Sequence, residues 1–174
     1  MDLDTLMAYG RAHSFNDIEW FDEPRPVEKD LLGSAVDGLV GFAEHGSGSV
    51  YATFQDQVFW IDSEGEQYAI AGSIDEFVDA LHYHAGSLYD AMSACQGASY
   101  VAPAQRAKPT ALRNRFGATW CEAARVALRN EYEGYEAFCA WAKQHGRGPA
   151  LDLVDRLVAL RPAVDTLRAL AAPR

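Results

Sequence analysis

The feature that most constrains the fold of this chain is a change of hydrophobic period to two between residues 36 and 71. Within residues 49–54, the apolar Val50, Ala52 and Phe54 alternate with side chains of the other face, which is typical of a half-buried strand. Short segments rich in Gly, Ser, Asp and Gln separate four expected strands, at residues 39–43, 49–54, 58–61 and 67–71. Short connections make successive strands antiparallel neighbours. The sequence therefore predicts a four-stranded antiparallel meander.

The segment before this sheet carries weaker signals. Residues 15–33 are rich in Asp and Glu and contain Pro24 and Pro26, so we expect an irregular acidic approach to the first strand. Residues 2–12 are expected to form a short helix whose length Gly10 limits.

A helix is expected directly after the sheet. Ser73 and Glu76 have the spacing of a capping box, and apolar residues follow at helical intervals. Gly86 is well placed to end this helix, and a second short helix is expected after Ser87. An amphipathic helix must bury its apolar stripe, so we expect the first of them to cover one face of the sheet.

The carboxy-terminal half is predicted to be helical. Residues 97–111 contain Gly97, Pro103 and Pro109, which favours a linker or a long surface loop. Helical stripes then follow, at Trp120, Ala124, Ala127 and Leu128, at Tyr135, Phe138, Cys139 and Ala142, at Leu151, Val154, Leu157 and Val158, and at Val164, Leu167 and Leu170. The 174 residues are thus expected to form one α+β domain, strand-rich at 36–71, with a helical extension at 112–174 packed on the same core.

Charge is distributed unevenly along the chain. Residues 1–90 hold 18 Asp and Glu against 3 Lys and Arg, a formal charge of −15, whereas residues 91–174 hold 7 against 12, a charge of +5. An acidic half repels phosphate backbones and speeds encounter with a basic protein. The alternative interpretation is that the charge only keeps the domain soluble.

Several classes of protein are disfavoured by composition. The longest apolar runs, such as residues 39–43, are far shorter than the roughly 18 residues that a membrane span needs. The start, Met1-Asp-Leu-Asp, lacks the positive charge of a secretory signal, so we expect a cytoplasmic protein. Cys95, Cys121 and Cys139 form no C-x-x-C pair and are expected to be reduced core thiols.

No catalytic or cofactor-binding motif stands out. His82 and His84 are two residues apart, and on a helix they would point about 200° apart, so a shared metal ion is not expected. Residues 46–49 (GSGS) lack the Lys-Ser/Thr of a phosphate-binding loop, and no Gly-x-Ser-x-Gly motif occurs. The basic run of Arg106, Lys108, Arg113, Arg115, Arg125 and Arg129 is too sparse to predict nucleic-acid binding and is expected to pair with the acidic half. We expect a protein that is not an enzyme and binds no cofactor.

The turns between strands supply the candidate binding residues. Asp56, Asp62, Glu64 and Glu66 are predicted to form an acidic edge for a cationic partner, or simply a solvated hairpin. Buried aromatic anchors supply most of the affinity in protein interfaces, and an alternating strand turns some aromatic side chains away from the core. The candidate anchors are Tyr51, Phe59, Trp60 and Tyr68, with packing under helices as the alternative, most of all for Phe59.

Three segments resemble the SUKH superfamily, the Smi/Knr-type domain. They are residues 39–54 (LVGFAEHGSGSVYATF), 58–66 (VFWIDSEGE) and 70–81 (IAGSIDEFVDAL). The family pattern is an apolar strand that ends in a Gly-rich turn, an aromatic strand, a hairpin with an acidic glycine-containing turn, and a helix that begins Ser-x-x-Glu-Phe. This chain departs from the pattern in having no Asn-Gly turn in residues 1–35 and in extending well past residue 110.

The resemblance implies a function in protein binding. It predicts an immunity protein that neutralises a bacterial toxin, often a nuclease, by direct binding. The alternative is an intracellular regulatory or scaffold protein of the same fold with no toxin partner. In either case the expected partner is a protein, with neither nucleic acid nor membrane involved.

Overall fold

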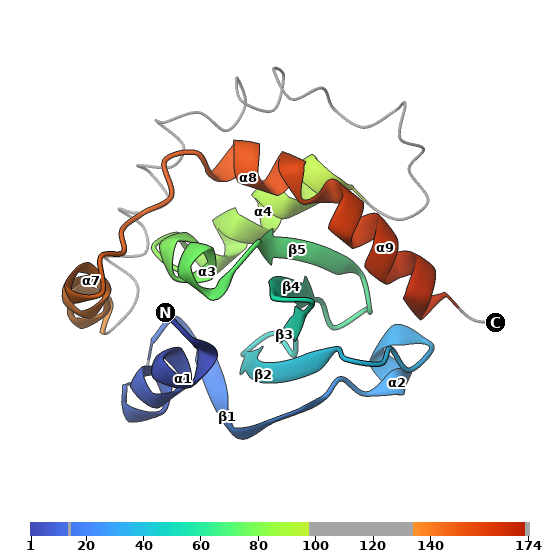
Figure 1. The fold of residues 1–174 in the computed structure, drawn as a ribbon, viewed down its shortest axis with the longest axis horizontal. Helices are drawn as coiled ribbons and strands as arrows, with labels where there is room; N and C mark the ends of the chain where they lie inside the picture. Colours follow the sequence, from blue (N-terminus) through green and yellow to red (C-terminus); the bar gives the residue numbers. More distant parts are fainter. Residues whose placement is uncertain (14, 98–133, 173–174) are drawn as a thin grey trace.

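A computed structural model describes residues 1–13, 15–97 and 134–172 (Figure 1). Most of the predicted linker at 97–111, the predicted helix that starts near Thr119 and the basic run all lie outside these ranges. The described part has an antiparallel sheet with helices around it, so it is α+β.

The sheet has five strands in the sequential order β1-β2-β3-β4-β5, with antiparallel neighbours throughout. They are β1 (Ile18–Pro26), β2 (Val40–His45), β3 (Val50–Phe54), β4 (Gln57–Ile61) and β5 (Gln67–Ala71). The last four are the predicted meander. The prediction of four strands was therefore wrong by one.

Strand β1 occupies part of the segment that was predicted to be irregular. Ile18 and Trp20 pair with His45 and Ala43 of β2, and the register then shifts before Arg25 pairs again. An edge strand tolerates prolines and charged residues because one side of its backbone needs no partner. This short and interrupted alternation is the reason that the period-two pattern did not reveal β1.

One face of the sheet is covered by α1 (Leu3–Ala12), α3 (Ile74–Ala80) and α4 (Ala85–Gln96), and the buried residues of α8 (Leu153–Ala159) belong to the same cluster. Helix α7 (Tyr135–Gln144) packs on α1, where Phe138 meets Tyr9. Leu6, Phe42, Tyr51, Phe77 and Phe138 are among the buried side chains of this layer. Phe42 and Phe77 meet edge to face, with ring centroids 5.7 Å apart, so the strand and helix aromatic groups interlock here.

The other face is covered by the end of the chain. Helix α9 (Arg161–Ala171) lies along β5 in Figure 1, with α2 (Lys29–Leu32) near its far end. Val164 and Leu167 of α9 join Phe59, Ile61 and Ala69 in a second buried cluster. Every residue of β5 is consequently buried, because both faces of that strand have a helix against them.

The predicted start of α3 is confirmed, and its predicted end is wrong. The Glu76 N–H donates to Ser73 Oγ at 3.2 Å, and Glu76 Oε2 accepts from the Gly72 N–H at 2.8 Å. The helix ends at Ala80, however, and Gly86 lies inside α4, which begins two residues before Ser87. The short helix expected at residues 2–12 is confirmed, since α1 spans Leu3–Ala12 and continues through Gly10.

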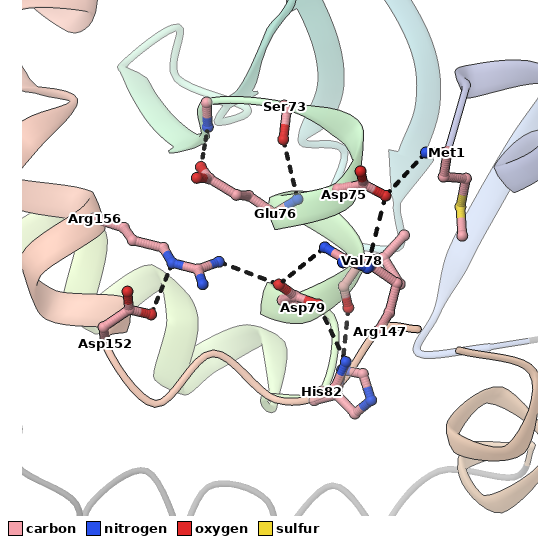
Figure 2. Close-up of polar contacts among 12 residues, drawn as sticks. Met1, Ser73, Asp75, Glu76, Val78, Asp79, His82, Arg147, Asp152 and Arg156 are labelled. Atoms are coloured by element: carbon pink, nitrogen blue, oxygen red, sulfur yellow. Dashed lines mark hydrogen bonds and ion pairs between the residues drawn. The ribbon is translucent and has the colours of Figure 1, made fainter. Parts of the chain in front are cut away.

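A group of ion pairs around Asp79 fastens the carboxy-terminal helices to α3 (Figure 2). The Asp79 carboxylate lies 3.3 Å from Arg156 of α8 and 3.7 Å from Arg147, and it accepts a hydrogen bond from the Gly148 N–H at 3.2 Å. Arg147 also contacts Asp75, which holds the Met1 amine at 3.0 Å. Each charge here has an opposite partner, so we interpret this cluster as structural.

Candidate binding pocket

A pocket lies at the end of the sheet where β2 and β4 finish and β3 and β5 begin. Its volume is about 350 Å³, near the lower end of the roughly 300–1,000 Å³ of small-ligand sites. It is lined by His45, Ser47, Ser49, Trp60, Asp62, Ser63, Glu64, Ala85, Gly86 and Tyr89, and we call this set the hairpin-end pocket. Two turns and the first turns of α4 thus meet at one hollow.

The acidic wall of the pocket is held by a turn that Asp62 organises. Asp62 Oδ1 accepts the N–H groups of Glu64, at 3.0 Å, and Glu66, at 2.9 Å. Gly65 has a φ of +87°, and a Cβ at that position would collide with the carbonyl of Leu31. The turn therefore requires glycine there. Its geometry leaves the Glu64 side chain exposed at the pocket.

His45 organises the opposite wall. The Ser47 N–H donates to His45 Nδ1 at 3.2 Å, and the Ser47 hydroxyl lies 2.9 Å from that of Ser49. Burial lowers the pKa of His45, with His84 acting in the same direction and Asp17 opposing both. The ring is therefore neutral near pH 7, and because Nδ1 accepts a hydrogen bond, Nε2 carries the proton.

Aromatic rings form the floor. Trp60 lies 5.2 Å from the His45 ring and 6.3 Å from the Tyr89 ring, centroid to centroid, and Tyr89 meets Tyr68 edge to face at 5.6 Å. The Tyr89 hydroxyl lies 3.5 Å from Asp62 Oδ2. Burial is the main cause that raises the pKa of Tyr68, so its phenol stays neutral. The pocket combines π faces with carboxylates.

The structure divides the predicted acidic residues among three environments. Asp62 and Glu64 line the pocket. Glu66 lies beside them but contacts Arg168 of α9, with 3.5 Å between Oε2 and Nη2. Asp56 is exposed in the two-residue turn between β3 and β4. That turn is at the opposite end of the sheet, about 13 Å away along a five-residue strand. The acidic turns therefore do not form one surface.

The predicted aromatic anchors are buried. The exposed fractions of Tyr51, Phe59, Trp60 and Tyr68 are 1%, 0%, 3% and 3%. The expectation that some would point away from the core was wrong, because helices cover both faces of β4 and β5. They pack under helices, as the alternative interpretation had it. Of these residues, Trp60 lines the hairpin-end pocket.

His45 and Tyr89 were not predicted as site residues. The segment at 45–48 was interpreted only as a turn, and Tyr89 lies in the helix that was expected after the sheet. Their meeting depends on strand pairing and on the path from α3 to α4. Apart from a histidine beside a Gly-rich turn, no signal in the sequence indicates that His45 and Tyr89 line one pocket.

Within residues 1–13, 15–97 and 134–172, no three His, Cys, Asp or Glu side chains are placed to hold a metal ion. His82 is buried, with Nδ1 3.1 Å from the Val78 carbonyl oxygen, whereas His84 is the N-cap residue of α4. In the same ranges no helix is long and apolar enough to cross a bilayer.

Comparison with known proteins gives no match to a family model, a curated protein or a solved structure. The resemblance to the SUKH superfamily therefore stays a prediction.

Proposed function

We propose that this chain is a non-enzymatic binding protein whose acidic sheet end masks a basic protein partner. In the specific form of the proposal, it is a cytoplasmic immunity protein that neutralises a bacterial toxin. The single observation that carries the proposal is the charge of the sheet end that bears the hairpin-end pocket.

The strand ends and turns at that end carry acidic residues. Residues 15–19, 44–50 and 61–67, which form the ends of the strands and the turns there, contain no Lys or Arg. They contain Asp17, Glu19, Glu44, Asp62, Glu64 and Glu66. Two of these carboxylates have a cation near them: Arg168 reaches Glu66 from α9, and Arg25 of β1 lines a second pocket together with Glu44. A surface of this sign attracts a basic protein and speeds its association.

Two of these carboxylates face each other. Glu19 of β1 and Glu44 of β2 are direct cross-strand partners, so their side chains lie on the same face of the sheet. Like charges in directly opposed positions destabilise a sheet. A cationic partner that sits over this pair would relieve the repulsion, which supports the proposal of a basic ligand.

The pocket has one contact of an enzymatic kind, between a serine and a histidine. Ser47 Oγ lies 3.0 Å from His45 Nδ1, the separation of a nucleophile and a general base. However, the Ser47 backbone N–H also donates to Nδ1, and in the described part of the chain no group accepts from the buried Nε2. A catalytic histidine needs a free lone pair toward the nucleophile and a third group that orients the ring. These contacts favour a turn over a catalytic dyad.

The first test is genetic and biochemical. The product of the neighbouring gene is expressed with and without this chain, and the expected result is toxicity that co-expression abolishes, together with direct binding of the two purified proteins. A toxic neighbour that does not bind contradicts the proposal. A non-toxic neighbour that binds supports the alternative of a regulatory or scaffold protein.

The second test examines the acidic end itself. Glu44→Lys combined with Glu64→Lys should slow association with the partner and flatten its dependence on salt, measured by stopped-flow fluorescence. Asp56→Lys combined with Asp90→Lys makes the same change of charge at exposed positions outside the pocket and is the matched control. Equal effects of the two pairs would exclude this end as the interface.

A further inference from the structure

The hairpin-end pocket joins two kinds of group that act together on cations. Asp62 and Glu64 supply negative charge, and Trp60 and Tyr89 supply aromatic rings. None of the described residues that line it is Lys or Arg. A cation near an aromatic face is attracted by the ring quadrupole, and a carboxylate nearby adds a charge-assisted hydrogen bond.

Elsewhere in this molecule, an arginine already lies against an aromatic ring and a carboxylate. The Arg168 guanidinium lies 5.8 Å from the centre of the Tyr68 ring, and its Nη2 lies 3.5 Å from Glu66. Tyr68 is in turn packed edge to face against Tyr89 of the pocket. The neighbouring pair, Tyr89 and Asp62, has the same chemistry.

The amino-terminal end of α4 contributes charge of the opposite sign. Ala85 and Gly86 line the pocket, and α4 has no side-chain hydrogen bond at its N-cap. A helix amino terminus is equivalent to about half a positive elementary charge, whereas Asp62 and Glu64 are two full negative charges. His45 is neutral and adds none. The balance in the pocket favours a cation.

We propose that the hairpin-end pocket binds an arginine side chain of the basic protein partner, its guanidinium group held between the Tyr89 ring and the carboxylates of Asp62 and Glu64. This inference rests on the proposed function for the source of the arginine. A guanidinium is planar, stacks on aromatic faces, pairs with carboxylates through two parallel hydrogen bonds and sheds water more easily than an ammonium. These properties make arginine a better fit than lysine.

The test uses the full chain and a small probe, Nα-acetyl-arginine amide. Binding is followed by the indole N–H signal of Trp60 in a two-dimensional ¹H–¹⁵N NMR spectrum, assigned with Trp60→Phe. The expected result is a saturable shift of this signal with a dissociation constant in the millimolar range, as suits one side chain. Nα-acetyl-citrulline amide has nearly the same shape without the charge and should give no saturable shift. Equal shifts with citrulline would overturn the proposal.

Variants locate the site. Glu64→Gln should weaken the arginine probe by about two- to fivefold, the usual range for one exposed ion pair, and Tyr89→Leu should weaken it by a similar factor through loss of the ring. Asp56→Asn at the far end is the matched control and should leave the affinity unchanged. Lysine amide binding as tightly as arginine amide, or no effect of Glu64→Gln and Tyr89→Leu, would overturn the assignment.

The proposal and the proposed function can fail separately. If the arginine probe does not shift Trp60 while the protein still binds its partner through the acidic end, the pocket assignment fails and the function stands. If the probe binds as expected while no basic protein partner is bound, the proposed function fails and the pocket stands.

Discussion

The side-chain amide of Gln96 hydrogen-bonds to both backbone groups of Ala69. Gln96 Nε2 donates to the Ala69 carbonyl at 2.7 Å, and its Oε1 accepts the Ala69 N–H at 2.9 Å. Ala69 lies in β5, the last strand of the sheet, so this amide occupies the place of a neighbouring strand. Arg168 extends the cover by donating to the Gln67 carbonyl at 2.8 Å. The otherwise open edge of the sheet is thus closed by side chains.

Gln96→Ala should therefore destabilise the protein strongly. Gln96 is fully buried and also donates to the Leu157 carbonyl at 3.1 Å, so its loss leaves three buried backbone groups without this partner. With about 1–3 kcal/mol for each unsatisfied group and partial relaxation, we expect a loss of about 3 kcal/mol. Urea denaturation measures it. Gln144→Ala, at an exposed position of α7, is the control and should have little effect on stability. An equally small effect of Gln96→Ala would contradict the role of Gln96 in closing the edge of the sheet.

Glu44→Gln should stabilise the isolated protein. The substitution removes the repulsion between Glu44 and its direct partner Glu19, and cross-strand pairs of this kind contribute about 0.2–1 kcal/mol. The gain should shrink in high salt because exposed charges are screened. Urea denaturation at low and high ionic strength tests both statements. Glu23→Gln, at an exposed residue outside the paired positions, is the control; a loss of stability with Glu44→Gln would mean that the pair is not repulsive.

Asp62 is expected to have a structural as well as a binding role. Asp62→Ala removes the acceptor for the Glu64 and Glu66 N–H groups and should cost about 1–3 kcal/mol. Asp62→Asn keeps an acceptor oxygen and should cost clearly less, while still removing the charge from the pocket. Thermal unfolding of the two variants separates the roles. Equal losses would show that the charge, and not the hydrogen bonding, stabilises the turn.

Folding stability should fall in acid partly because of His45. Its pKa in the unfolded chain is about 6.5, and burial lowers it in the folded state. As the pH falls through about 6.5, the unfolded state takes up a proton that the folded state resists, so folding stability falls. His45→Asn should remove this part of the loss. We expect the difference in urea midpoint between pH 8 and pH 5.5 to be smaller in the variant; an equal or larger difference would exclude His45 as a cause.

Gly10→Ala should destabilise the protein although Gly10 lies inside a helix. The same change in an exposed helix usually stabilises by about 0.5–1 kcal/mol. Here a Cβ on Gly10 would occupy the position of the Trp20 ring, and overpacking costs about 1–3 kcal/mol. Gly148→Ala, where nothing lies within 4 Å of the added carbon, is the control. Thermal unfolding of both variants gives the comparison, and a gain at Gly10 would mean that Trp20 moves freely.

The sequence by itself determined the local elements. Alternation and turn residues predicted β2 to β5, and the Ser73 and Glu76 spacing predicted the start of α3, because hydrophobic period and capping act between residues that are close in the chain. The acidic turn at 62–66 was predicted for the same reason. The polar contacts inside that turn join residues at most four positions apart.

The tertiary structure alone decided which side chains of the sheet are buried and which distant residues meet. Tyr51 and Tyr68 are buried because helices from distant parts of the chain cover the sheet, and period two does not reveal whether the second face is covered as well. Gly10 is required by Trp20, and Gln96 closes an edge 27 residues away. The hairpin-end pocket joins residues from 45 to 89. Long-range packing brings these groups together, and it leaves no periodic trace in the sequence.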